Sequence, residues 1–222
     1  MIKTDAQLSQ EVELELASEP KLNASEIEIN VDQGAVSLLG TIDTYAEKAI
    51  AENAAKRVSG VRAIALDLKV RLLEHDVRTD SDIAVAVQNA LNWDVLLPAT
   101  VTAKVEDGWV TLEGPVTWNY QREGAERAVH HLTGVVGVFN SIAIRPQAPP
   151  SRVKEQVEAA LERRALAGVK SIRVDVAGGK VTLTGHAESW QAIEDAANAA
   201  WAAPGVTEVI DQVKREMTLG TP

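Results

Sequence analysis

Apolar residues recur along the chain at two spacings, one typical of helices and one of strands. Three segments have an apolar residue at every fourth position, which predicts amphipathic helices; these residues are Leu8, Val12 and Leu16, then Ile83, Val87 and Leu91, then Val153, Val157 and Leu161. Two short stretches with an apolar residue at every second position follow the first segment, Ile27, Ile29 and Val31 before Gly34, and Val36 and Leu38 after it. Such alternation around a glycine predicts a β-hairpin.

The hairpin segment is repeated without gaps in residues 31–40, 105–114 and 176–185. Each repeat has glycine at its fourth and tenth positions, and a Gly-Val pair follows 20 residues after the second glycine. The nine glycines are Gly34, Gly40 and Gly60, then Gly108, Gly114 and Gly134, then Gly179, Gly185 and Gly205. A fixed register of this kind indicates an internal repeat, so the chain is predicted to contain three copies of one module.

The nine glycines are predicted to have structural roles. The first glycine of each copy is expected to supply the positive φ of a tight hairpin turn. The second is expected to end the second strand, where the backbone turns or lies close to a neighbour. The third is expected to end a helix as a C′ residue, and the valine after it is expected to open another strand.

A second helix is predicted between the second and third glycines of each copy. Alanines 11 and 14 residues after the second glycine share one helical face, which would let the helix pack closely on a sheet; they are Ala51 and Ala54, Ala125 and Ala128, and Ala196 and Ala199. The fold class is therefore α+β, with three tandem αββαβ modules, each a mixed three-stranded sheet with two helices on one face. The predicted boundaries are 5–73 for copy one, 79–146 for copy two and 151–216 for copy three.

This order of elements resembles the BON domain family in its OsmY-like form. The resemblance rests on the glycine in the hairpin, the second glycine, the alanine-rich helix and the Gly-Val pair, and it covers nearly the whole chain three times over. It implies a non-enzymatic module of bacterial envelope and stress-response proteins, osmotic stress included, that is often associated with phospholipid binding. A cytoplasmic relative in the family binds potassium, which implies a second kind of ligand.

Charge and composition narrow the range of partners. The formal net charge is −10 and the pI is about 4.9, so nucleic acid is not an expected partner. The chain has no cysteine, which excludes disulfides and thiol chemistry. No apolar run is long enough for a transmembrane segment. The first residues do not resemble a secretory signal, so a cytoplasmic location is expected, or a periplasmic one if a signal peptide has been removed.

The sequence contains no catalytic constellation, so an enzyme is not expected. It has no nucleophile elbow, no phosphate-binding glycine loop and no His-Glu-x-x-His motif. His130 and His131 are adjacent, and adjacent residues on a helix point about 100° apart, so they are not expected to chelate a metal. No metal and no cofactor is assigned.

Aromatic and basic residues of copies two and three give the candidate binding residues. All five tryptophans lie in these two copies. Trp109 follows the turn glycine, where copies one and three have Ala35 and Lys180; a position that accepts lysine is expected to be exposed. Packing of the rings between copies is the alternative. The candidates for contact with a lipid or a partner are Trp93, Trp109, Trp118, Tyr120, Arg163 and Arg164.

The leading functional hypothesis is a stress-associated scaffold that contacts phospholipid headgroups or a membrane-associated protein. Arg163 and Arg164, with Lys170 and Arg173, form the main basic concentration, and binding that depends on so few cations should be weak and sensitive to salt. One alternative is a binder or sensor of potassium or another small cation, held by backbone carbonyls. Another is a structural protein that self-assembles into a homo-oligomer through exposed sheet edges.

Overall fold

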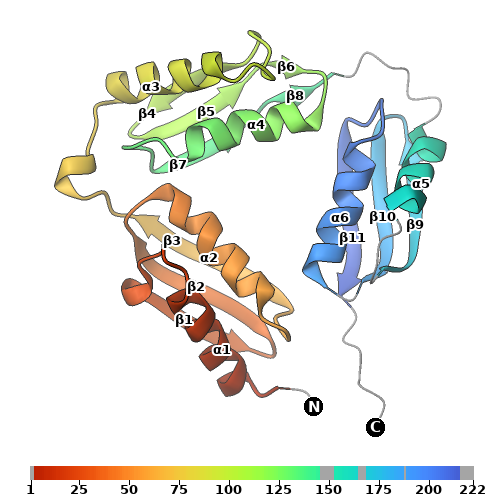
Figure 1. The fold of residues 1–222 in the computed structure, drawn as a ribbon, viewed down its shortest axis with the longest axis horizontal. Coiled ribbons are helices and arrows are strands. Elements are labelled where there is room, and N and C mark those ends of the chain that lie inside the picture. The colour runs from red at the N-terminus through yellow and green to blue at the C-terminus, as the bar shows by residue number, and fades with distance from the viewer. Residues whose placement is uncertain (1–2, 146–152, 165–168, 188, 216–222) are drawn as a thin grey trace. The chain divides into compact units, whose positions relative to one another are not determined.

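The structure, a computed structural model, describes residues 3–145, 153–164, 169–187 and 189–215. The chain forms two compact units, residues 1–113 with 124–141 and residues 114–123 with 142–222. The elements occur in the predicted order three times along the chain, as the labels of Figure 1 show. The boundary between the two units therefore falls inside copy two.

Copy one has a three-stranded sheet with two helices on one face (Figure 1). Its elements are α1 (Asp5–Ala17), the short 3₁₀ helix η1 (Ala24–Glu26), β1 (Ile27–Asp32), β2 (Ala35–Ile42), α2 (Tyr45–Arg57) and β3 (Ala63–Val70). β2 lies in the middle, antiparallel to β1 and parallel to β3, as predicted for a hairpin followed by a helical crossover. Residues from both helices and from β2 share one buried core that includes Val12, Ala51 and Leu38.

Copy three repeats this topology. It consists of α5 (Val153–Arg164), β9 (Val169–Ala177), β10 (Lys180–Ala187), α6 (Trp190–Trp201) and β11 (Glu208–Arg215). The central strand β10 is antiparallel to β9 and parallel to β11. Val157 of α5, Leu183 of β10 and Ala196 of α6 belong to the same buried core. The predicted αββαβ module and its mixed sheet are thus confirmed in two separate parts of the chain.

Copy two follows the same order, but its sheet is interrupted. A 3₁₀ turn, η2 (Glu74–Asp76), precedes α3 (Asp80–Trp93), β4 (Thr102–Glu106), β5 (Trp109–Glu113), β6 (Pro115–Val116), α4 (Asn119–His130), β7 (Gly137–Asn140) and β8 (Ala143–Ile144). One sheet has the order β4-β5-β7, and a second contains only β6 and β8. Gly114 separates β5 from β6, so here the second glycine does end a strand.

The threefold glycine register is explained by a contact between the first and third glycines of each copy. The Arg62 N–H donates a hydrogen bond to the Gly34 carbonyl at 2.8 Å. A Cβ added to Gly34 would lie 3.2 Å from the Gly60 carbonyl oxygen. The corresponding distances are 3.0 Å from Gly108 to Gly134 and 2.7 Å from Gly179 to Gly205. The hairpin turn therefore packs directly on the backbone between the second helix and the last strand.

The prediction that the second glycine ends a strand is wrong for copies one and three, whereas the predicted close approach to a neighbour is confirmed at Gly40. Gly40 and Gly185 do not end strands but lie inside β2 and β10, with φ of 129° and 143°. A Cβ added to Gly40 would lie 2.0 Å from the Glu26 carbonyl oxygen. Glycine is therefore required because two backbone segments approach each other closely, and the strand continues past it.

Two further details of the glycine prediction are corrected. Gly60 lies three residues beyond the end of α2 and is not its C′ residue, and β3 begins at Ala63, so Val61 precedes the strand and is buried instead. The same offset holds for Val135 and Val206. In the third hairpin the positive φ belongs to Gly178 (64°) rather than to Gly179.

An aspartate from the first helix holds the hairpin turn in copies one and two. The Asp5 carboxylate accepts the N–H groups of Gln33 at 2.9 Å and Gly34 at 3.0 Å. Gln33 has a φ of 46°, which is uncommon for a residue other than glycine, and these two charge-assisted hydrogen bonds stabilise it.

The turn of copy two is built in the same way, and that of copy three differs in sequence. The Asp80 carboxylate accepts the N–H groups of Asp107 and Gly108, both at 2.9 Å, and Asp107 has a φ of 52°. In the sequence of copy three the residue three places before the first apolar position of the helix is Pro150, and the turn residue is Gly178. A glycine at the turn makes the aspartate unnecessary, because glycine adopts positive φ without help.

Candidate functional site

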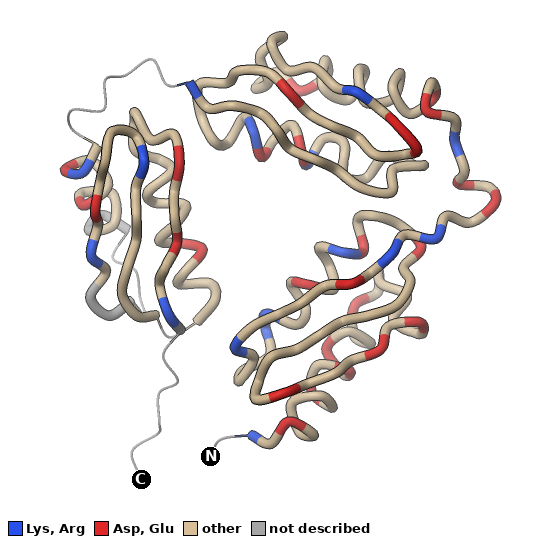
Figure 2. The backbone as a smooth tube through the Cα atoms, turned by 180° about the vertical axis from the view of Figure 1, so that it is seen from behind, with Lys and Arg blue, Asp and Glu red and all other residues tan. Residues whose placement is uncertain are grey.

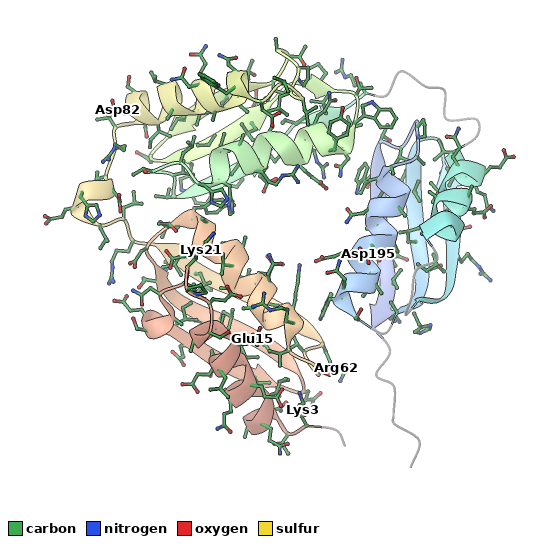
Figure 3. All side chains as sticks on the ribbon, viewed as in Figure 1. Lys3, Glu15, Lys21, Arg62, Asp82 and Asp195 are labelled. Carbon is green, nitrogen blue, oxygen red and sulfur yellow. The ribbon has the colours of Figure 1, made fainter. Side chains whose placement is uncertain are left out.

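The outward face of α3 is uncharged beyond the first turn of the helix. Asp82, labelled in Figure 3, forms a capping box with Thr79 and is the last charged residue before Asp94. Figure 2 accordingly shows α3 in tan after its acidic first turn. Because Ile83, Val87 and Leu91 are buried against the sheet, the opposite face presents Val85, Asn89 and Trp93 to solvent.

Apolar side chains gather where α3 ends. Trp93 is 85 % exposed, Val95 is 94 % exposed and Leu96 is 61 % exposed. Val85, which lies eight residues before Trp93 on the outward face of α3, is exposed as well. These four residues, Val85, Trp93, Val95 and Leu96, are called the α3 surface below. Single exposed apolar residues are common, but a run of them at one helix end is a feature of interaction sites.

The loop that carries Val95 and Leu96 is fixed by local contacts. The Asp94 carboxylate accepts the Leu96 N–H at 2.9 Å, and the Asp94 carbonyl accepts the Leu97 N–H at 3.1 Å. The Leu97 side chain turns the other way and lies 3.4 Å from the position that a Cβ would occupy on Gly124 of α4. Leu97 therefore anchors the loop, and its two predecessors project from it.

A second exposed apolar feature lies on the open face of the β4-β5-β7 sheet. Trp109 and Phe139 stack with ring centroids 4.7 Å apart and an interplanar angle of 17°. They are 42 % and 56 % exposed, on the sheet face opposite the buried Val110. The Trp109 ring also covers Gly137, where an added Cβ would overlap the ring. This pair has a structural role in addition to being accessible.

Trp93 and Trp109, both predicted contact residues, do not form one site. The first turn of α3 contacts the hairpin beside Trp109 through Asp80. Trp93 lies thirteen residues further along the helix, which corresponds to about 20 Å at 1.5 Å per residue. The two rings therefore belong to different ends of copy two.

The other predicted contact residues lie on two further elements. Trp118 and Tyr120 flank the first residue of α4. Trp118 is half-buried and its backbone N–H donates to the Gln121 side chain at 3.1 Å, whereas Tyr120 is exposed. Arg163 and Arg164 are the last residues of α5, and their side chains lie outside the described residues.

Sequence reasoning missed four members of these surfaces, Val85, Val95, Leu96 and Phe139. The sequence does contain a signal for Val95 and Leu96, because they are apolar residues in a connection, where polar residues are the rule. Phe139 occupies a column that has Ala65 in copy one and Ile210 in copy three. A residue type that changes this freely between copies indicates a solvent-facing position.

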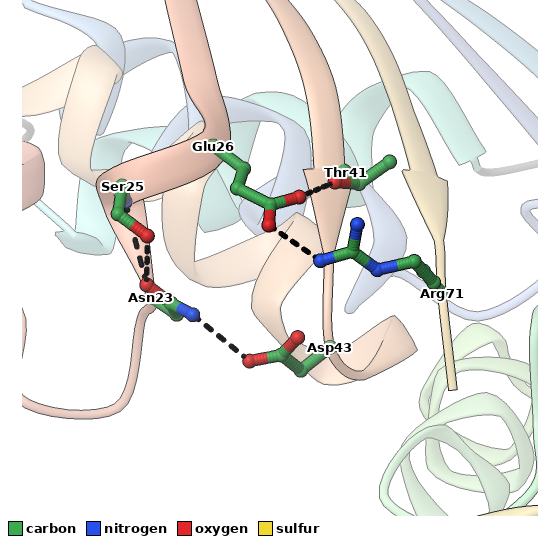
Figure 4. A network of polar contacts seen from close by, with 6 residues as sticks. All are labelled: Asn23, Ser25, Glu26, Thr41, Asp43 and Arg71. Carbon is green, nitrogen blue, oxygen red and sulfur yellow. Dashed lines mark hydrogen bonds and ion pairs between the residues drawn. The ribbon is translucent and has the colours of Figure 1, made fainter. Parts of the chain in front are cut away.

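The matching connection of copy one, residues 18–26, ends in a polar network (Figure 4). The Glu26 carboxylate accepts hydrogen bonds from Arg71 at 2.5 Å and from the Thr41 hydroxyl. The Arg71 guanidinium, together with that hydroxyl, lowers the pKa of Glu26 below its usual value. Asn23 donates to Asp43 at 3.1 Å. Copy one therefore closes this end of its sheet with polar groups.

The described residues show no arrangement typical of a metal site or of a bilayer-spanning helix. No group of three or more His, Cys, Asp or Glu side chains within them is placed to hold a metal ion. The rings of His130 and His131 lie 5.0 Å apart, edge to face, and burial, followed by the neighbouring His131, lowers the pKa of His130. Within the same residues, each helix is too short or too polar to cross a membrane.

The repeated architecture defines a tandem protein of BON domains. The BON domain family matches residues 4–71, 79–146 and 151–217, so the chain belongs to this family and contains three tandem copies. Among characterised proteins it is similar to osmotically-inducible protein Y of Escherichia coli (strain K12), with 27 % identity over 146 residues, which are 62 % of this chain and 71 % of that protein.

The chain has a detectable likeness to several solved structures. One is CdsD, a structural protein of the type III secretion system of Chlamydia trachomatis, with 14 % identity and a TM-score of 0.28 over 96 % of this chain and 94 % of that one. Another is the periplasmic domain of the inner membrane protein PrgH of S. typhimurium, with 11 % identity and a TM-score of 0.22 over 91 % and 99 %. Scores this low carry no conclusion about function.

Proposed function

We propose that this chain is a non-enzymatic, stress-associated protein that binds phospholipid membrane surfaces through the α3 surface of copy two. The observation that carries the proposal is the projection of Trp93, Val95 and Leu96 from one helix end. Tryptophan favours the headgroup level of a bilayer, and aliphatic side chains beside it favour the upper acyl region. The similarity to osmotically-inducible protein Y supports the association with stress.

Copy one supplies the internal contrast for this proposal. Its first helix also exposes a large apolar residue, Leu14, but Glu13 and Glu15 flank it in the sequence. The residue that corresponds to Trp93, two places after the last core leucine of the helix, is Ser18. An isolated leucine between carboxylates does not favour entry into a bilayer, because the carboxylates would have to lose their water.

Flotation of the full chain with vesicles of phosphatidylcholine and phosphatidylglycerol tests the proposal. Trp93→Ser, which introduces the residue of copy one, should lower the partition coefficient about tenfold, because the loss of one interfacial ring costs roughly 1.4 kcal/mol. Leu14→Ala is the matched control and should bind as the unchanged chain does. Equal flotation of Trp93→Ser and the unchanged chain would contradict the assignment of the site.

A further inference from the structure

We infer that the α3 surface binds membranes by inserting apolar side chains and not by attracting anionic headgroups, so that a zwitterionic phosphatidylcholine surface is a sufficient ligand. This inference rests on the proposed function and concerns the kind of lipid. The segment between Arg78 and Lys104 contains no lysine and no arginine. Its only charged residues are three aspartates, Asp80, Asp82 and Asp94.

The two cations that flank this segment are already engaged. The Arg78 guanidinium donates to the carbonyl groups of His75 at 2.7 Å and Val77 at 2.9 Å. Lys104 forms an ion pair with Glu106 at 2.7 Å.

In space, Arg127 of α4 also reaches this loop, and its Nη2 lies 3.9 Å from the position that a Cβ would occupy on Gly124, with the Asp94 carboxylate 4.0 Å from the same position. A headgroup phosphate that approached the loop would therefore meet the Asp94 carboxylate together with this cation, and not an isolated positive charge.

The shape of the α3 surface favours a deformable partner. Asp94 and Leu97 fix the loop on either side, and the side chains of Val95 and Leu96 project between them, 94 % and 61 % exposed. Such a convex group can enter the disordered upper part of a bilayer without a matching pocket. An apolar groove on a protein would have to be complementary to the same projection, and that partner is an outcome that the test below can reveal.

Membrane binding by insertion should respond to salt differently from binding by attraction to headgroups. Burial of apolar area does not depend on screening, whereas attraction between exposed charges weakens as the Debye length falls from about 10 Å to about 3 Å between 0.1 M and 1 M salt. The salt-sensitive binding predicted from the sequence relied on Arg163 and Arg164 of copy three. The α3 surface contains no counterpart of that pair.

A single fluorescent label can follow insertion, because the chain has no cysteine of its own. The full chain with Val95→Cys, labelled with the environment-sensitive dye NBD, is titrated with vesicles of phosphatidylcholine alone and with added phosphatidylglycerol. Emission should shift to the blue with both, and the partition coefficient should change less than about twofold as salt rises to about 0.5 M. A label at Leu14→Cys, the control, should not shift.

Val95→Lys separates the two mechanisms. Insertion predicts that the added charge lowers partitioning about tenfold on both kinds of vesicle, whereas headgroup attraction predicts tighter binding to anionic vesicles. Tighter binding of that variant, or partitioning that requires phosphatidylglycerol and disappears in salt, would overturn the inference while the proposed function stands. Failure of the full chain to float with any vesicle would instead refute the proposed function, and with it this inference.

Discussion

Copies one and two share a fold but place different chemistry in the connection after their first helix. In copy one this connection is polar and ends in the Glu26–Arg71 contact. In copy two it presents Val95 and Leu96 to solvent beside the exposed Trp93. The buried positions of the first helices are occupied by branched aliphatic residues in both copies, Leu8, Val12 and Leu16 in copy one and Ile83, Val87 and Leu91 in copy two. The buried helix face and the glycine contacts are therefore common to the two copies, whereas the connection after the first helix differs in its chemistry.

A similar divergence occurs at one cross-strand position on the open face of the sheets. The pair formed by the first residue of the central strand and its parallel partner is Ala35 with Ala63 in copy one, Trp109 with Gly137 in copy two, and Lys180 with Glu208 in copy three. Trp109 covers its glycine, and Lys180 forms an ion pair with Glu208 at 3.1 Å. The same backbone geometry thus supports small, aromatic or charged pairs.

The largest expected effect concerns the part that the copies share. Gly40→Ala should destabilise copy one by about 3 kcal/mol or more, because its Cβ would collide with the Glu26 carbonyl oxygen in a backbone that cannot rotate away. Native-state hydrogen exchange of β2 amides in the full chain measures this, since three modules need not unfold together.

Substitutions at two other glycines provide comparisons for the effect of Gly40→Ala. Gly114→Val, in the same column with a φ of 118°, should destabilise copy two by about 1–3 kcal/mol. At Gly178 no atom lies within 4 Å of an added Cβ, so the cost of Gly178→Ala comes only from the left-handed backbone conformation. We expect copy three to be destabilised by about 1 kcal/mol. If Gly40→Ala cost no more than Gly178→Ala, the close approach to Glu26 would not be what requires glycine.

Part of this scaffold could be predicted from the sequence because three copies show the same columns. The helix faces, the alanines and the hairpins follow from local periodicity, and Ala51, Ala125 and Ala196 are fully buried as predicted. The sequence did not reveal that Gly34 packs against Gly60, because a contact across 26 residues leaves no local pattern.

The candidate site was predictable only in part. Trp93 was identified by its residue type, since tryptophan is frequent at interfaces. Val95, Leu96 and Leu97 are equally apolar in sequence, and periodicity cannot assign a side to residues in an irregular loop. Only the structure shows that Leu97 faces Gly124 while the other two project, so the exposure of the loop depends on a tertiary contact.

The aspartate that binds the hairpin turn should contribute to the stability of copies one and two, and copy three has no counterpart of it in sequence. Asp80→Ala removes the acceptor of two backbone N–H groups and leaves Asp107 at a positive φ without support, so copy two should lose about 2 kcal/mol. Ser81→Ala, an exposed neighbour in the same helical turn, is the control and should change little. Exchange rates of β4 and β5 amides give the answer, and unchanged rates in Asp80→Ala would show that the turn does not need the carboxylate.

A smaller effect is expected on the open face of the sheet. Trp109→Ala should destabilise copy two by about 1–2 kcal/mol, because the stack with Phe139 is lost and Gly137 is uncovered. Lys180→Ala, at the same position of copy three, should cost less than about 0.5 kcal/mol, because an exposed ion pair contributes little. A double-mutant cycle between Trp109 and Phe139 measures the stack itself, and a coupling near zero would mean that the two rings are neighbours without mutual stabilisation.

The smallest effect is a pH dependence at His130 of copy two, whose ring lies edge to face with that of Tyr45 of copy one, 4.9 Å away. At the helix position where copy one has Lys56, copy two has the half-buried His130, and burial, followed by His131, lowers the pKa of His130 from its usual 6.5. Because the folded state disfavours the protonated ring, the stabilisation is present above the unfolded pKa and is lost as pH falls through the lower folded pKa. Between pH 7 and about pH 5 copy two, and the part of copy one around Tyr45, should therefore lose stability relative to the His130→Gln variant, while copy three should show no difference between the two proteins. Hydrogen exchange at both pH values, corrected for intrinsic rates, measures the change, and an identical pH response of the two proteins in copy two would show that His130 does not cause it.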